Sequence, residues 1–102
     1  MSKKVPFEQF GEGQYLYFNI ARLAQLEQVC GCGISGIVAK QELNLSNLIK
    51  IFMIGLAHHK KHNELWYAEQ IQKKLDEGAS LEEDFVVPAV KAIAGSGILG
   101  KA

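Results

Sequence analysis

The feature that constrains this chain most is a ten-residue stretch, Leu48–Ala57, in which Lys50 is the only charged residue. Folded as a helix, it carries apolar side chains on nearly every side, which is typical of a helix in the middle of a domain or partly in an interface. A helix that spans a membrane needs about 20 apolar residues. We therefore expect a core helix capped by Ser46, and no membrane partner.

The composition supports an ordinary globular protein. Over 102 residues, 48% are hydrophobic and 22% are charged, which predicts one domain over residues 1–102. Eleven basic residues balance eleven acidic ones, whereas proteins built to bind nucleic acid carry a positive surplus and a basic helix face. We predict no nucleic-acid partner. A chain this short with so apolar a central helix also favours a homo-oligomer.

The N-terminal part predicts a β-hairpin over residues 5–18. Val5–Phe10 and Gln14–Phe18 are rich in aromatic residues and flank the turn Gly11-Glu12-Gly13. A two-stranded hairpin is marginal alone. Its aromatic face must therefore lie on helices or on another chain.

The rest of the chain, residues 19–94, predicts helices, followed by a flexible tail at 95–102. Asn19 is placed as an N-cap, and Gly31 as the end of that helix. A short helix follows at Ile34–Glu42. Together with the hairpin, this predicts a mainly α fold: a small helical bundle with a short N-terminal β-hairpin.

Two more helices are predicted after the central one. Asn63 caps Glu64–Glu77, which ends at Gly78, and Ser80 with Glu83 has the spacing of a capping box. Pro88 lies inside the last helical pattern. Because proline lacks an N–H and clashes with the preceding turn, the helix must kink or divide there.

Cysteine usage indicates a reducing compartment. Cys30 and Cys32 are the only cysteines, and their spacing is poor for a disulfide. The N-terminal lysines are not followed by the apolar run of a signal peptide. We expect a soluble, cytoplasmic protein.

A metal site is the chemical alternative to consider. His58 and His62 are four residues apart, and with Cys30 and Cys32 they would supply four ligands of the types that zinc accepts. The cysteines are closer together than in usual zinc sites, and two lysines beside the histidines repel a cation. Histidines and lysines also occur at a helix C-terminus simply because the negative end of the helix dipole stabilises their positive charge. We predict no metal and no cofactor, with metal binding as an alternative.

No enzyme signature is present in the sequence. Nothing fixes Cys30 near a histidine with a third orienting group. Gly31-Cys32-Gly33 lacks the Gly-Lys-Ser/Thr ending of a phosphate loop. We expect a protein that is not an enzyme.

Adjacent aromatic residues are the candidate partner-binding site. Trp66 and Tyr67 are consecutive on one amphipathic helix, so they cannot both face the same core stripe. Tryptophan and tyrosine are enriched at interfaces. In the alternative interpretation, one packs inward and the other lies on the surface. Tyr15 and Tyr17 of the hairpin are the second candidate surface.

The order of these features resembles the tail assembly chaperones of long-tailed phages and of phage-derived gene transfer agents. Nearly the whole chain takes part in the resemblance. The matching positions are the Gly11–Gly13 turn; Tyr15-Leu16-Tyr17-Phe18-Asn19; Leu23, Leu26, Glu27 and Gly31; Gly55-Leu56; Ala68, Ile71, Leu75 and Gly78; and the helix after Ser80.

The resemblance implies a non-enzymatic role in the cytoplasm of a bacterial host. Such chaperones coat the tape-measure protein, keep it soluble and recruit the tail-tube protein; they are often made in two lengths by a frameshift. A helix-in-groove mode suits this role, with the groove involving the Glu64–Glu77 helix. The alternatives are a structural head–tail connector or minor tail protein, and a small metal-binding regulator.

Overall fold

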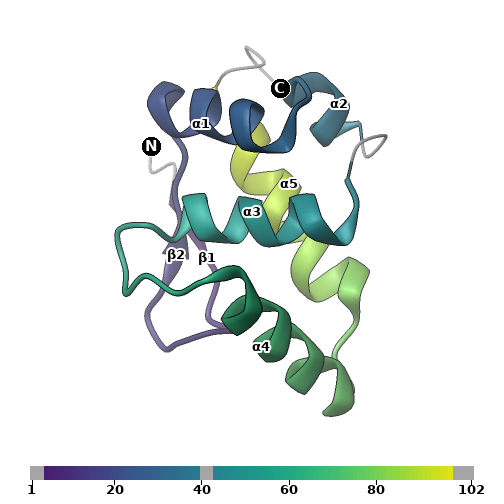
Figure 1. Cartoon of the computed structure of the whole chain (residues 1–102). Coiled ribbons are helices and arrows are strands. Elements are labelled where there is room, and N and C mark those ends of the chain that lie inside the picture. The colour runs from purple at the N-terminus through teal and green to yellow at the C-terminus, as the bar shows by residue number, and fades with distance from the viewer. Residues whose placement is uncertain (1–3, 40–42, 98–102) are drawn as a thin grey trace.

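The apolar stretch forms the helix around which the other elements are arranged. The computed structural model describes residues 4–39 and 43–97. Within them the fold is mainly helical with a two-stranded N-terminal hairpin (Figure 1), as predicted. The elements in chain order are β1 (Val5–Pro6), β2 (Tyr15–Leu16), α1 (Ile20–Cys30), α2 (Ile34–Val38), α3 (Leu45–Gly55), α4 (Glu64–Asp76), the π-helical turn η1 (Glu82–Val86) and α5 (Val87–Ala94).

Helix α3 occupies the centre of the structure. It packs against α1, α4, α5 and β2, and in Figure 1 it crosses the middle of the molecule with α1 and α4 on opposite sides. Ile51 and Phe52 are fully buried. The prediction of a helix buried in the middle of the fold is therefore confirmed.

The beginning of α3 differs from the prediction. Asn44, not Ser46, is the N-cap, and its side-chain oxygen accepts a hydrogen bond from the Asn47 N–H at 2.8 Å. Asparagine and serine are equally good N-caps. Because the helix already begins at Leu45, Asn44 takes the N-cap position and Ser46 lies in the first helical turn.

The hairpin is confirmed, but its strands are short. β1 and β2 pair antiparallel with Val5 opposite Leu16 and Pro6 opposite Tyr15. Beyond Leu16 the chain leaves β1, and the Tyr17 N–H donates to the Gly55 carbonyl at 3.0 Å. The hairpin is therefore anchored on the C-terminal end of α3 rather than extended by its own ladder.

Most of the predicted helix ends are found as expected. The Asn19 and Asn63 side chains cap α1 and α4, and Gly31 ends α1 with φ = 71°. Helix α2 is shorter than predicted and ends at Val38, and residues 40–42 of that prediction lie outside the described residues. Of the predicted tail, only residues 95–97 are described; they form a turn.

Pro88 is accommodated by a change of helix type. The Val87 N–H donates to the Glu82 carbonyl, five residues back, in the π-helical turn η1. Pro88 then lies in the first turn of α5, where its missing N–H leaves no bond unmade. The backbone therefore stays helical through this region, and the change to π-type bonding, rather than the predicted kink or division, accommodates Pro88.

The start of this last segment also uses a different acid from the one predicted. The Ser80 hydroxyl oxygen accepts from the Glu83 N–H at 3.2 Å, as in a capping box. The reciprocal bond, from the Ser80 N–H, goes to the Asp84 carboxylate at 2.8 Å. Glu83 is therefore only the backbone partner of Ser80.

The contact between β2 and α3 gives a stability prediction. A Cβ added at Gly55 would lie 2.8 Å from side-chain atoms of Leu16 and Phe18, both fully buried. Gly55→Ala should therefore lower the free energy of unfolding by about 1–3 kcal/mol through overpacking, measured by urea denaturation. Gly33→Ala is the control, because the nearest atom to its added Cβ is 3.7 Å away, and a loss of about 0.5 kcal/mol is expected there. Equal losses in both variants would contradict the close-packing argument.

Candidate functional site

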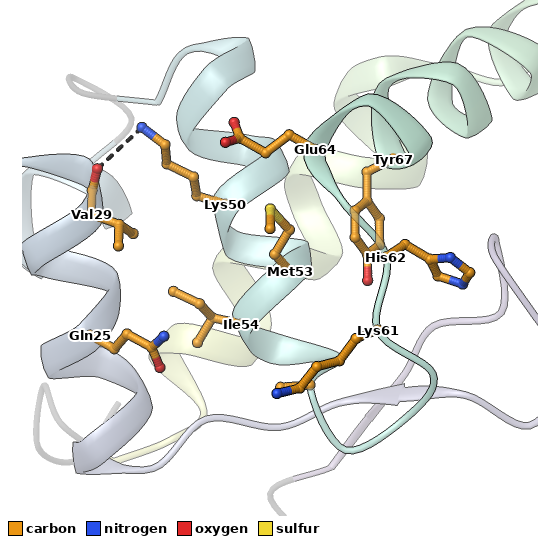
Figure 2. A pocket seen from close by; sticks show the side chains of 10 residues that line it. Gln25, Val29, Lys50, Met53, Ile54, Lys61, His62, Glu64 and Tyr67 are labelled. Atoms are coloured by element: carbon orange, nitrogen blue, oxygen red, sulfur yellow. Dashed lines mark hydrogen bonds between the residues drawn. The ribbon is translucent and has the colours of Figure 1, made fainter.

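A groove lies where α1 and α4 both rest on α3. Its volume is about 310 Å³, and Figure 2 shows the side chains that line it. They come from α1, from α3, from the loop after α3, and from the start of α4. These residues are Gln25, Val29, Lys50, Met53, Ile54, Ala57, Lys61, His62, Glu64 and Tyr67.

The groove has an apolar floor and a charged rim. Met53 and Ile54 of α3 form the floor, with Val29 of α1 beside them, 43% exposed. On the rim, the Lys50 ammonium donates to the Val29 carbonyl at 3.1 Å. Figure 2 shows Lys50 and Glu64 at one end and Lys61 at the other. An apolar floor with a charged rim suits a partner that inserts an apolar side chain and carries polar groups on either side of it.

Trp66 and Tyr67 both lie against Phe10 but are buried to different degrees. Tyr67 is 2% exposed, its ring lies 5.5 Å from that of Phe10, and burial raises the pKa of its hydroxyl. Trp66 is half-buried and stacks on the His62 ring, with centroids 3.5 Å apart. The arrangement is the one in which one aromatic residue packs inward and the other lies nearer the surface. Tyr67 still lines a wall of the groove.

The hairpin tyrosines belong to another cluster. Tyr15 and Tyr17 are half-buried; the Tyr15 ring stacks on His58 at 4.4 Å, and the Arg22 guanidinium lies 5.2 Å from the centre of the Tyr17 ring. Among the described residues, neither tyrosine has a ring contact with Trp66 or Tyr67. The two candidate surfaces are therefore separate, and only the first adjoins the groove.

Two consecutive histidines bind the backbone of Tyr15. The Phe7 N–H donates to the Gln14 carbonyl across the antiparallel pair. Because successive residues of a strand turn their backbone groups to opposite sides, the N–H and C=O of Tyr15, the next residue, point away from β1. The Tyr15 N–H donates to His59 Nε2 at 3.1 Å, and the Tyr15 carbonyl is 2.9 Å from His58 Nε2. The histidines thus satisfy the backbone N–H and C=O of an edge strand, which would otherwise face solvent.

The bonds of His58 determine its protonation state. Arg22 Nη1 lies 2.9 Å from His58 Nδ1 and can only donate. Nδ1 is therefore the acceptor, and the proton is on Nε2, which donates to Tyr15. His58 must be neutral for both bonds to form. Burial lowers the pKa of His58, and the charges of His59, Arg22 and Lys4 lower it further, against the opposing effect of the Tyr15 carbonyl.

The structure does not favour the metal alternative. Both ring nitrogens of His58 are engaged, and among residues 4–39 and 43–97 no group of three or more His, Cys, Asp or Glu side chains is arranged to hold an ion. Burial raises the pKa of the Cys30 thiol, neighbouring Cys32 raises it further, and Lys50 opposes both. The raised pKa keeps the Cys30 thiol protonated at neutral pH, which makes it a poor nucleophile. The two cysteines pack against the core.

None of the helices within residues 4–39 and 43–97 has both the length and the apolar character that a transmembrane segment requires.

The sequence analysis placed the binding groove at the Glu64–Glu77 helix with Trp66 and Tyr67. Of these, Glu64 and Tyr67 line the groove and Trp66 does not. The sequence did not reveal that the floor comes from α3. The available signal was the apolar surplus of the central helix: Met53 remains only half-buried because α1 and α4 do not fully cover it.

Comparison of the chain with models of protein families, with curated proteins and with solved structures finds no match. The likeness to tail assembly chaperones therefore rests on the sequence pattern alone.

The histidine pair gives a prediction of pH dependence. The pKa of His58 is lower in the folded than in the unfolded protein, so the unfolded chain binds more protons between the two values. The stability that neutral His58 contributes is therefore complete above about pH 6.5 and is lost as the pH falls through the folded-state pKa. We expect a lower thermal unfolding midpoint at pH 5.5 than at pH 7.5.

His58→Gln tests this assignment, because a glutamine amide supplies one acceptor and one donor and does not titrate. The variant should show a smaller difference between the two midpoints. His62→Gln removes an imidazole that stacks on Trp66 and makes no bond to Tyr15; it serves as the control. An unchanged pH difference in His58→Gln would show that other groups cause the effect.

Proposed function

We propose that this protein is a non-enzymatic tail assembly chaperone of a phage or prophage, which binds and shields the tape-measure protein in the bacterial cytoplasm. The family comes from the resemblance in the sequence, and the mode of binding comes from the groove. The resemblance also implies that the protein recruits the tail-tube protein, and we include this role in the proposal.

The observation that carries the binding mode is the half-buried Met53 on the floor of an open groove between two helices. A tape-measure protein is a long helix with apolar stripes, which aggregate when bare. An amphipathic helix binds by placing apolar residues into such a groove. Methionine suits this use, since its flexible side chain adapts to different apolar partners.

Shielding a long client does not need tight binding at each site. Many copies along one helix act through effective concentration, so each contact can be weak and reversible. A shallow groove with a small apolar floor fits that requirement better than a deep pocket. Reversibility also allows the chaperone to leave once tail-tube subunits assemble.

The groove is tested by Met53→Glu. A carboxylate on the floor should reduce co-purification with a co-expressed tape-measure protein at least about tenfold, because a charge cannot be buried unpaired against an apolar stripe. The measurement is the amount of client retained on the tagged protein after co-expression.

Leu65→Glu is the matched control. Leu65 is on α4 and 64% exposed, and it does not line the groove, so the same change should leave client recovery intact. Circular dichroism should remain helical in both variants. A double Trp66→Ala, Tyr67→Ala variant is less informative, because losing the buried Tyr67 ring costs about 3–5 kcal/mol. Normal recovery with Met53→Glu would exclude the groove as the binding site of the tape-measure protein.

Assembly chaperones and structural tail proteins differ in where they end up. A chaperone should be absent from mature particles, whereas a connector or minor tail protein should remain in them. Mass spectrometry of purified particles distinguishes the two. Stoichiometric amounts of this chain in the particles would overturn the chaperone proposal in favour of the structural alternative.

A further inference from the structure

We infer that the groove selects an amphipathic helix in which an apolar side chain is followed or preceded by an acidic residue that reaches Lys61. This inference rests on the proposed function, since it names the partner's chemistry at the same site. It depends on the size of the groove and on the charges at its two ends.

The size of the groove sets how much of the partner can enter. About 310 Å³ is at the lower end of the range for small-molecule pockets. The floor at Met53 and Ile54 therefore has room for one or two large apolar side chains. On a helix these are residues three or four apart, which lie on one face.

The two ends of the groove differ in charge. At one end Lys50 and Glu64 bring opposite charges to the rim, and the Lys50 ammonium already donates to the Val29 carbonyl. At the other end lies Lys61, with the neutral amide of Gln25 across from it (Figure 2). Lys61 is therefore the rim cation to which a partner carboxylate is complementary.

The other charged side chains near the loop strengthen this asymmetry. Lys60 precedes Lys61, and Arg22, one turn before Gln25 on α1, holds the Tyr17 carbonyl at 2.9 Å. Within the part of the chain that the structure describes, no acidic side chain lines the Lys61 end of the groove. A basic residue of a partner helix placed at this end would meet like charges, so the groove discriminates by repulsion as well as by attraction.

The inference is tested with two synthetic helical peptides that share one apolar stripe, with leucines at positions i, i+3 and i+7. One peptide has glutamates beside the stripe and the other has lysines at the same positions. At low ionic strength, fluorescence anisotropy should show the glutamate peptide binding about fivefold more tightly or better, a ratio of the size expected for rim charges. The preference should shrink in high salt.

Lys61→Glu should reverse the preference between the two peptides. Lys73→Glu changes the net charge equally at an exposed site on α4 outside the groove, and it should leave the preference as in the parent protein. Equal binding of both peptides, or a reversal caused by Lys73→Glu as well, would overturn the inference.

The result is separable from the proposed function. If Met53→Glu abolishes recovery of the tape-measure protein but the parent protein does not discriminate between the peptides, the groove binds its client without charge selection, and only this inference fails. If Met53→Glu has no effect on the client while the peptides are still discriminated through Lys61, the groove recognises acidic amphipathic helices and the tape-measure assignment fails.

Discussion

The burial of α3 on nearly all of its sides is the constraint on which the rest of the structure depends. A helix with apolar residues around its whole circumference needs cover from several directions. The chain supplies α1, α4, α5 and the hairpin for this purpose. The segment from Leu16 to Phe18 packs directly on Gly55, which has no side chain there. A small protein can bury such a helix only by using almost all of its other elements.

The groove is a consequence of that arrangement. Because α1 and α4 cover different sides of α3, the strip of α3 between them stays partly open, with Met53 at its floor. The loop after α3 then serves two purposes. His58 and His59 bind the edge of β2, and Lys61 and His62, a few residues later, line the groove. The anchoring of the hairpin and the shape of the groove are therefore linked through one short segment.

The histidines also illustrate how one sequence motif fits unlike roles. The string from His58 to His62 has the spacing of a metal site and the position of a dipole-stabilising helix end. The folded chain uses it differently: His58 and His59 bind a strand, and His62 stacks on Trp66. What decides among these roles is the position of Tyr15, forty-three residues earlier in the chain.

The amino-acid sequence by itself determined the helical class, the hairpin, the buried central helix and the caps at Asn19, Gly31 and Asn63, because periodicity and capping are local properties of the chain. The tertiary structure alone decided which of two neighbouring aromatic residues is buried, which residues line the groove and what the histidines bind. It also decided that a π-helical turn accommodates Pro88. These outcomes depend on which distant elements come together, and local spacing carries no information about that.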